Sequence, residues 1–426
     1  MISFEDAKQK ILDGIVPVKE TEEIKVISSL NRILSTDVIA SFDVPPCNNS
    51  AMDGYAVQYE DISEIEEVRL QVIGELPAGK SFDKELKTGE ALRIMTGAPM
   101  PKGADTVVMQ EVTLQDGDWV SISPQATKFD ANIRFQDGCP PLAGVRGWIK
   151  KGANVRLQGE SIKKGELILQ TGTRIRPQEM GLLASMGYGT VNVYRQLNVA
   201  IISTGDELIS IGEKRTPEKI YDSNRYSLTG LLTSLGVEII DLGIVKDDRE
   251  MLKTKFREAS ERADVVITSG GISVGKYDLV REVVDSLGNV EFWQVNIKPG
   301  KPLSFGKIGR CYFFGLPGNP VSVIVSFIKF VRCALLKMAG CKEYDKTVLF
   351  KAKTNFQMTK KQGRLEWLRG ILSYGEDGWI VTTTGAQGSG ILNSMISANC
   401  LIQILPDQKE ITKGDDVWVE SLEWAL

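Results

Sequence analysis

The chain has 426 residues, with 51 Lys and Arg against 55 Asp and Glu, so its formal charge is −4 and no basic field favours nucleic acid or an anionic membrane. It contains no histidine, which excludes Ser-His-Asp and Cys-His nucleophile systems, histidine-ligated zinc or haem, and a histidine general base. At about 150 residues per domain the length predicts about three domains, and the composition is that of an ordinary globular protein.

The cysteines and the N-terminal residues predict a cytoplasmic protein. The six cysteines are scattered singly, without a C-x-x-C pair, as is typical of reduced thiols. Glu5 and Asp6 stand where a signal peptide needs basic residues. The longest apolar run, 321–336, contains Lys329 and Arg332, so we expect a buried helix and not a membrane span. We therefore expect no membrane and no nucleic-acid partner.

The first part of the chain predicts helical segments followed by a small β-rich domain. Apolar residues at helical spacing predict a helix over 3–15, with Ser3 as its N-cap, and a second amphipathic stretch over 25–34. Short β-branched or alternating runs such as 68–74 and 106–109 are separated by Pro/Gly turns. This pattern predicts a small, mostly β module.

Residues 176–340 alternate apolar strands with helices. Strands are predicted at 197–202, 237–244, 264–268 and 311–315, and helices at 177–186, 223–235, 250–262, 278–287 and from 321 onward. Strands that are apolar throughout are typical of a parallel sheet covered on both faces, so we expect a central doubly wound, mostly parallel α/β domain. Short strands at 348–352, 379–383 and 400–405 then predict a β-rich C-terminal domain.

Three Gly-rich turns follow strands of this predicted sheet, at 203–206, 269–275 and 315–319. Ligands of such sheets bind at the carboxyl ends of the strands, where glycine allows close approach and helix N-termini favour anions. One such turn can be a simple tight connection, but three together favour an anionic, nucleotide-like substrate. The residues expected to bind it are Ser203, Thr204, Gly205, Gly270, Gly271, Ser273, Gly275, Pro317, Gly318 and Asn319.

Charged residues collect near the same strand ends. The acidic ones are Asp206, Glu207, Asp247, Asp248 and Asp278. Carboxylates beside phosphate loops suit Mg²⁺, although Asp at a helix start is also an ordinary N-cap. A loop stiffened by Pro and Gly holds Lys298 and Lys301, and the polar loops 363–369 and 387–390 have no assignment of their own.

Six motifs occur in a fixed order: 49–57 (NSAMDGYAV), 93–99 (RIMTGAP), 203–208 (STGDEL), 269–275 (SGGISVG), 298–302 (KPGKP) and 315–320 (GLPGNP). Together they resemble the MoeA-type molybdopterin molybdenumtransferase family, which is related to the E domain of gephyrin, over essentially the whole chain. The resemblance implies a transferase that inserts molybdate into adenylylated molybdopterin with the help of Mg²⁺ and releases AMP. It also implies an elongated protomer, a homodimer, and contacts with the adenylyltransferase and with molybdoenzyme apoproteins.

With the resemblance, we expect four domains. They are a helical N-terminal and linker domain (1–45 with 146–176), a small β-rich domain (46–145), a molybdopterin-binding α/β domain (177–340) and a C-terminal β-rich domain (341–426).

The resemblance assigns roles position by position. Asp53 and Thr96 match residues implied to reach the active site of the partner subunit. The carboxylates matched to the pyrophosphate and the cation are Glu207, Asp247 and Asp278, with Asp248 as a rival to Asp247. The residues matched to a molybdate pocket are Lys298, Lys301, Ser322, Arg369 and Ser389, with Arg364 as a rival to Arg369. A tetrahedral dianion suits such donors with no carboxylate close by.

The chain departs from the family pattern at 158–161, which reads QGES where the family usually reads Arg-Gly-Glu-Asp. The missing carboxylate at Ser161 is therefore not carried over, and whether Glu160 replaces it stays open. Residues 131–138 are nearly repeated at 153–160, which indicates a local duplication or insertion. Two alternatives remain: a gephyrin-like binding scaffold, and an adenylyltransferase-type enzyme, which would need only the α/β region.

Overall fold

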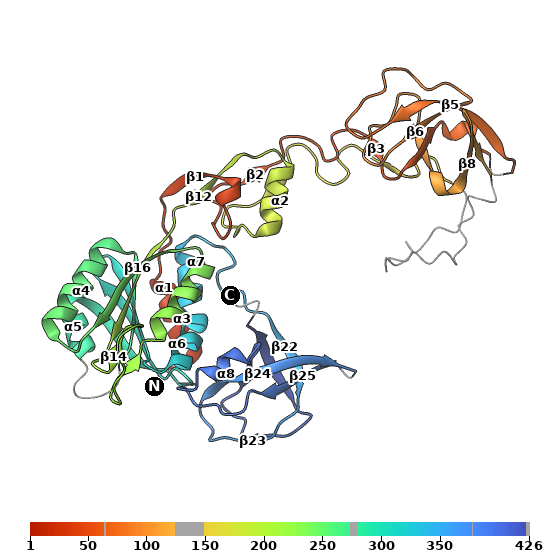
Figure 1. Cartoon of the computed structure of the whole chain (residues 1–426). Helices are drawn as coiled ribbons and strands as arrows, with labels where there is room; N and C mark the ends of the chain where they lie inside the picture. The colour runs from red at the N-terminus through yellow and green to blue at the C-terminus, as the bar shows by residue number, and fades with distance from the viewer. Residues whose placement is uncertain (64, 124–148, 273–278, 377, 423–426) are drawn as a thin grey trace. The chain divides into compact units, whose positions relative to one another are not determined.

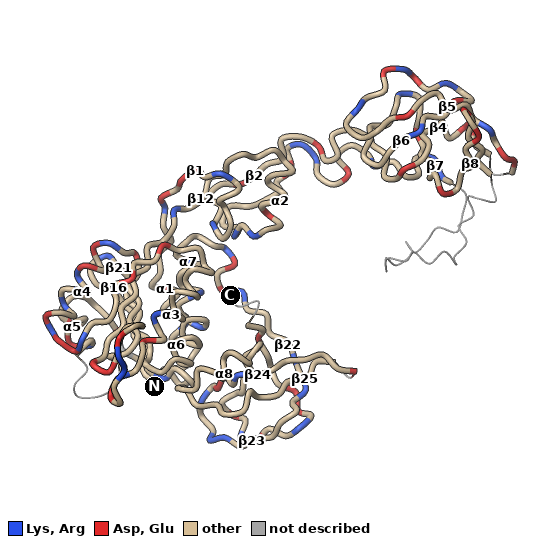
Figure 2. The backbone as a smooth tube through the Cα atoms, viewed as in Figure 1, with Lys and Arg blue, Asp and Glu red and all other residues tan. Residues whose placement is uncertain are grey.

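The computed structural model describes residues 1–63, 65–123, 149–272, 279–376 and 378–422. The chain divides into two compact units (Figure 1): unit 1 comprises Met1–Thr36 and Gln170–Leu426, and unit 2 comprises Asp37–Leu169. Figure 2 shows Lys and Arg interspersed with Asp and Glu in both units, as the small net charge suggests. The predicted boundaries of four domains remain a prediction.

Unit 1 contains a six-stranded sheet in the order β16-β13-β17-β21-β20-β18. Its strands are β13 (Asn198–Thr204), β16 (Glu238–Val245), β17 (Val265–Ser269), β18 (Gly288–Gln294), β20 (Pro302–Ile308) and β21 (Cys311–Leu316). Strands β16, β13, β17 and β21 are parallel to one another. Strand β20 pairs antiparallel with β21, and β18 pairs antiparallel with β20. The predicted mostly parallel sheet is thus confirmed. Neither β18 nor β20 is among the predicted strands, because Gly, Glu and Lys interrupt their apolar pattern.

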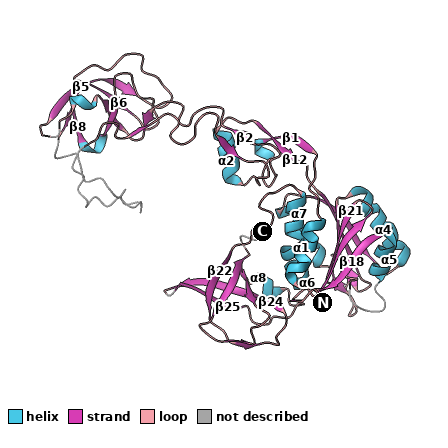
Figure 3. Cartoon of the chain, turned by 180° about the vertical axis from the view of Figure 1, so that it is seen from behind, coloured by secondary structure: helices cyan, strands magenta, loops and turns pink. Residues whose placement is uncertain are grey.

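Helices cover both faces of this sheet (Figures 1 and 3). One face carries α4 (Arg249–Arg262) and α5 (Leu279–Leu287), and the other carries α1 (Phe4–Gly14), α3 (Asn224–Ser234), α6 (Pro320–Ser326) and α7 (Arg332–Met338). Successive residues of β13 point to opposite faces, so Ile201 lies in one apolar core and Ile202 in the other. The doubly wound prediction is confirmed. In the described part of the chain, no helix is long and apolar enough to cross a membrane.

The predicted amphipathic helix over 25–34 is wrong. The structure has a strand, β1 (Thr21–Lys25), and a single 3-10 turn, Val26–Ser28, in this region. Strand β1 pairs antiparallel with β12 (Thr190–Tyr194), beside helix α2 (Pro177–Ser185). Within 25–34, the N–H of Asn31 donates to Ile175 O at 2.8 Å and the N–H of Leu34 donates to Thr173 O at 3.0 Å. These distant partners satisfy the backbone, and local periodicity does not report them.

The strand order creates a crevice at one place in the sheet. The connection from β13 through α3 to β16 covers one face, and the connection from β16 through α4 to β17 returns over the other face. The chain therefore leaves β13 and β17, which are neighbours, in opposite directions. Ligands of open α/β sheets bind at such a switch point, outside the carboxyl ends of the strands.

The C-terminal part of unit 1 is a closed ring of five strands, β24-β25-β22-β28-β26, because β26 also pairs with β24. The strands are β22 (Leu349–Thr354), β24 (Leu365–Gly375), β25 (Gly378–Thr383), β26 (Cys400–Ile404) and β28 (Asp416–Ser421). Closure removes exposed strand edges and encloses a core of Leu368, Val381 and Ile402. Strand β19 (Ile297–Lys298) adds in parallel to β24, which ties the lysine loop to the ring. The predicted β-rich C-terminal region is confirmed.

Unit 2 is built on a six-stranded mixed sheet in the order β7-β4-β6-β5-β9-β8. The strands are β4 (Gly54–Val57), β5 (Val68–Leu76), β6 (Glu90–Ile94), β7 (Thr106–Met109), β8 (Thr113–Asp116) and β9 (Trp119–Ile122). Short pairs β2–β11 (Val38–Ile39 with Leu167–Leu169) and β3–β10 (Asn49–Ser50 with Val155–Arg156) complete it. The predicted β module is confirmed. The first copy of the duplicated segment lies outside the described residues.

Candidate functional site

A cavity of about 700 Å³ lies in unit 1 at the carboxyl ends of β13, β17 and β21. The three Gly-rich turns contribute Thr204, Gly205, Gly270, Gly271, Pro317, Gly318 and Asn319 to its wall. Ser203 is buried, with its Oγ 3.3 Å from Ser269 Oγ. Ser273 and Gly275 lie outside the described residues. The sequence-predicted turns therefore meet in one place.

Gly270 is a position that only glycine fits. Its φ is +89°, and a Cβ there would lie 2.6 Å from the backbone carbonyl oxygen of Thr204. Its N–H donates to Leu316 O at 3.1 Å, so this residue joins the ends of all three strands. The hydroxyl of Thr204 is buried without a hydrogen-bond partner in the described chain. A bound ligand would be a natural partner for this orphaned hydroxyl.

The acidic part of the wall consists of Glu207 and Asp247. Burial, and then the nearby carboxylates of Asp206 and Glu207, raise the pKa of Asp247 above its ordinary value. Carboxylates that repel one another in this way suit a bound cation. Among the described residues, however, no group of three or more carboxylates or thiolates is close enough to hold a metal ion by itself. The third expected carboxylate, Asp278, lies outside them.

The structure distinguishes Asp247 from its neighbour Asp248. Asp248 is the N-cap of α4, where its Oδ1 accepts a hydrogen bond of 2.8 Å from the N–H of Met251. Asp247 instead lines the cavity. The role of an ordinary helix N-cap therefore explains Asp248. Asp247 is not the N-cap, and its place in the cavity wall allows it to contact a ligand.

The basic part of the wall consists of Lys298, Lys301 and Arg364. Lys298 Nζ lies 3.0 Å from a carboxylate oxygen of the buried Glu366. This differs from the expectation of a molybdate pocket with no carboxylate close by. Within the described chain no carboxylate pairs with Lys301. Among the described residues, Lys301 and Arg364 are thus the cations of this wall without a carboxylate partner, whereas the half-exposed Lys298 is paired with Glu366.

Arg369 does not line this cavity. Its side chain is 1% exposed, and its guanidinium donates to Ser394 Oγ and to Gly388 O, each at 3.0 Å. Its own N–H donates to the side-chain oxygen of Gln387 at 2.8 Å. Arg369 therefore braces the loop 386–389 from behind, and Gln387, Gly388 and Ser389 reach the cavity from that loop. Sequence reasoning missed Glu366 and Gln387, although both stand in the polar loops it had singled out.

The two predicted hydroxyl donors, Ser322 and Ser389, both line the cavity. Asn319 Nδ2 donates to Ser389 Oγ at 3.0 Å, and the N–H of Val321 donates to Ser389 O at 3.1 Å. These bonds join the start of α6 to the loop that Arg369 braces. The C-terminal region is thereby hydrogen-bonded to the third Gly-rich turn, 315–319.

Asp53 and Thr96 belong to unit 2, where they form a pair. Thr96 donates to Asp53 Oδ1 through its N–H at 2.7 Å and its Oγ1 at 2.8 Å. The backbone bond first, and then the hydroxyl bond, lower the pKa of Asp53, so this exposed carboxylate stays ionised. In the same unit Glu160 accepts a bond of 2.7 Å from the N–H of Leu157, and Ser161 is exposed.

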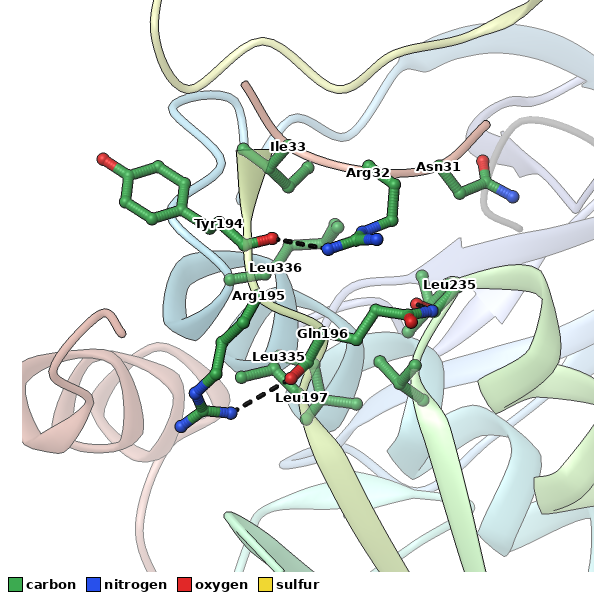
Figure 4. A pocket seen from close by; sticks show the side chains of 13 residues that line it. Asn31, Arg32, Ile33, Tyr194, Arg195, Gln196, Leu197, Leu235, Leu335 and Leu336 are labelled. Carbon is green, nitrogen blue, oxygen red and sulfur yellow. Dashed lines mark hydrogen bonds between the residues drawn. The ribbon is translucent and has the colours of Figure 1, made fainter. Parts of the chain in front are cut away.

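A much smaller cavity of unit 1, about 20 Å³, is shown in Figure 4. Polar groups around it are already paired: Arg32 donates to Tyr194 O at 2.8 Å, and Arg195 donates to Gln196 O at 3.0 Å. Leu335 and Leu336 of α7 form part of its wall. It has room for about one water molecule and suits no substrate.

Comparison with known proteins decides the family. Residues 2–187 match the MoeA N-terminal region (domains I and II), 200–337 match a probable molybdopterin binding domain, and 351–422 match the MoeA C-terminal region (domain IV). A molybdopterin molybdenumtransferase of Haemophilus influenzae is 38% identical over 428 residues, which cover 100% of both chains. The chain belongs to the molybdopterin molybdenumtransferase family.

Further relatives agree with this membership. A molybdopterin molybdenumtransferase of a Nostoc species is 36% identical, over 95% of this chain and 89% of its own length. The crystal structure of a molybdopterin biosynthesis MoeA protein of Pyrococcus horikoshii superposes with a TM-score of 0.79 at 31% identity, over 99% of this chain and 100% of that one. The resemblance stated from the motifs, the multidomain α/β fold and the transferase class are confirmed.

Proposed function

We propose that this member of the molybdopterin molybdenumtransferase family makes molybdenum cofactor, by inserting molybdenum from molybdate into adenylylated molybdopterin and releasing AMP. The observation that carries the proposal is the order of charges along the cavity. Glu207 and Asp247 follow β13 and β16 at one edge of the sheet, whereas Lys298 and Lys301 precede β20 near the other. The Gly-rich turns after β17 and β21 lie between them.

This order fits a substrate with two chemically different ends. The glycine turns leave their backbone open to a pyrophosphate, and the unpartnered hydroxyl of Thr204 can donate to it. Glu207 and Asp247 are the described residues that would hold Mg²⁺ there. When bound, Mg²⁺ would neutralise the phosphate oxygens and polarise the phosphoanhydride. The mutual repulsion of the carboxylates fits this role.

The other end of the cavity suits molybdate as the second substrate. Lys301 and Arg364 provide positive charge that no carboxylate of the described residues pairs with, and Ser322 and Ser389 provide hydroxyl groups. The protein holds molybdate beside the two thiols of the dithiolene. Two molybdenum–sulfur bonds then form while one oxide leaves as water with the two thiol protons, so molybdenum keeps its oxidation state. Water cleaves the phosphoanhydride in the coupled step, and AMP leaves.

We further propose that the protein acts as a homodimer, in which Asp53 and Thr96 of one protomer complete the cavity of the other. Two hydrogen bonds from Thr96 hold the Asp53 carboxylate ionised and fixed on an exposed turn. Such a fixed, exposed anion suits contact with a ligand or cation better than it suits a role in packing.

The test is a defined reaction of purified protein with adenylylated molybdopterin, Mg²⁺ and molybdate, followed by AMP release and by reconstitution of an apo-molybdoenzyme. Asp247→Asn should lower AMP release at least tenfold. The matched control is Glu250→Gln, which removes an exposed carboxylate from the first turn of α4, outside the cavity. Equal AMP release by wild type and Asp247→Asn would contradict the proposal. Formation of the adenylylated pterin from ATP would instead indicate the adenylyltransferase alternative.

A further inference from the structure

A second large cavity of unit 1 carries a cluster of positive charge that the proposed reaction does not use. It has a volume of about 650 Å³ and shares no residue with the first cavity. Four segments form it: the residues before α2, helix α7, the segment 341–348 that leads into β22, and the end of β28. Its basic residues are Arg174, Arg176, Arg332, Lys342 and Lys346, and its acidic residues are Glu343 and Glu420.

The acidic residues of this second cavity are already committed to other partners. Glu343 pairs with Lys346 at 3.0 Å, and Glu420 forms a buried pair with Lys329. Arg176 pairs at 2.6 Å with Glu179. The carboxylates therefore do not balance the remaining cations, which are Arg174, Arg332 and Lys342.

Arg332 and Arg174 are the centre of the cluster. The Nε of each is buried and has no hydrogen-bond partner within the described residues. The acceptors of Arg174 among the described residues are neutral: Asn31 Oδ1 at 3.0 Å and Ser234 O at 2.9 Å. In the part of the chain that the structure describes, the guanidinium of Arg332 has no hydrogen bond or ion pair.

Both guanidinium groups belong to side chains that line the same cavity, so their positive charges disfavour one another. Burial first, and then the charge of Arg332, lower the pKa of Arg174, and burial lowers the pKa of Arg332. Asp345 attracts Arg332 weakly, but its carboxylate pairs with Lys8. A half-buried guanidinium whose Nε–H is buried and unpaired is destabilising unless an anion lies beside it.

We propose that this second cavity binds a doubly charged tetrahedral oxyanion between Arg174 and Arg332, with Lys342 at its rim. Guanidinium groups present forked N–H donors that match the oxygens of such an anion. The ammonium group of Lys342 makes a weak contact of 3.5 Å with Gln170, which an anion would readily replace. The shared chemistry fits either phosphate, free or as part of a small molecule, or molybdate itself. This site goes beyond the proposed reaction, because it lies apart from the cavity where that reaction would occur.

The experiment titrates inorganic phosphate and, separately, molybdate into the full-length protein by calorimetry. Lys301→Met serves as the background, since it weakens anion binding in the first cavity. Adding Arg332→Met, which keeps the apolar stem, should weaken the remaining binding at least tenfold. The matched control adds Arg257→Met, which removes an exposed arginine from α4, and should change nothing. The anion that binds more tightly identifies the source, and binding of either one supports the site only if Arg332→Met weakens it.

Stability provides a second readout that does not depend on the reaction. In phosphate-free buffer Arg332→Met should be at least as resistant to urea as wild type, because it relieves repulsion of Arg174. In the Lys301→Met background, phosphate should raise the urea midpoint, and adding Arg332→Met should remove most of that rise. If Arg332→Met folds poorly, Lys342→Met tests the same site from its rim, with a loss of at least threefold expected. The proposal is wrong if neither anion binds in the Lys301→Met background. It is also wrong if neither Arg332→Met nor Lys342→Met changes the affinity for the anion that binds.

Discussion

Replacing Arg369 by Met tests whether this arginine holds the loop 386–389 in place at the wall of the first cavity. The guanidinium is 1% exposed and makes two hydrogen bonds of 3.0 Å, to Ser394 Oγ and Gly388 O. A bond from a charged donor contributes about 1.5 kcal/mol, so the loss should be about 3 kcal/mol of local stability. The third contact, 3.5 Å to Ala386 O, adds little at that length.

The assay compares amide hydrogen exchange in peptides that cover 365–375 and 386–389. A loss of about 3 kcal/mol corresponds to exchange that is about 100-fold faster, because each 1.4 kcal/mol is a factor of ten. Arg364→Met is the matched variant, since it removes the same group from the cavity wall instead. It should leave exchange unchanged and raise the KM for molybdate about tenfold or more, as expected for a lost charge-assisted hydrogen bond.

The opposite pattern would refute this reasoning. If Arg369→Met kept wild-type exchange and raised the KM for molybdate, then Arg369 would contact molybdate in a state with a different loop, and Arg364 would be the bystander. Both variants remove one guanidinium group. A difference between them in amide exchange or in KM therefore reflects where the arginine lies and not the change in net charge.

Three further predictions follow from single contacts. Burial and the neighbouring carboxylates raise the pKa of Asp247, so its ionised form destabilises the metal-free protein. Asp247→Asn should therefore raise the urea midpoint at pH 7. The difference in midpoint between this variant and wild type should vanish as the pH falls through the raised pKa of Asp247. Thr96→Val removes one of the two donors that lower the pKa of Asp53, so this pKa, followed by carbon-13 NMR, should rise part of the way to its ordinary value. Gly270→Ala, with φ +89° and a blocked Cβ position, should cost at least about 2 kcal/mol more than Gly309→Ala, which has φ +59° and open space, as measured by urea unfolding.

Each of these predictions has a result that would contradict it. An Asp247→Asn midpoint below that of wild type at pH 7 would show that the carboxylate is stabilised and not strained. An unchanged pKa of Asp53 would mean that the hydroxyl bond of Thr96 is absent in solution. Equal losses in the two glycine variants would show that contact with the neighbouring strand does not restrict Gly270.

Much of the fold could be predicted from the sequence because its signals are local. Apolar strands that alternate with amphipathic helices specified the doubly wound sheet, and Ser3 specified the start of α1, where its Oγ accepts a bond of 3.0 Å from Asp6. The Gly-rich turns marked the carboxyl ends of three strands, and the switch-point rule brought them together. The ordered motifs then indicated the family. The helix expected at 25–34 failed because the end of this stretch pairs with distant segments, Ile33 with Arg174 and Leu34 with Val193.

The side chains of the candidate site were only partly predictable, because their directions depend on contacts between distant segments. Spacing cannot separate Asp247 from Asp248, or Arg364 from Arg369; the N-cap of α4 and the closed ring of strands decide both. The pairing of Lys298 with Glu366, which are 68 positions apart, arises because β19 adds to β24. The sequence by itself determined which kinds of charge surround the ligand. Only the tertiary structure decided which of those charges are free to bind it, because an ion pair depends on which chain segments become neighbours in space.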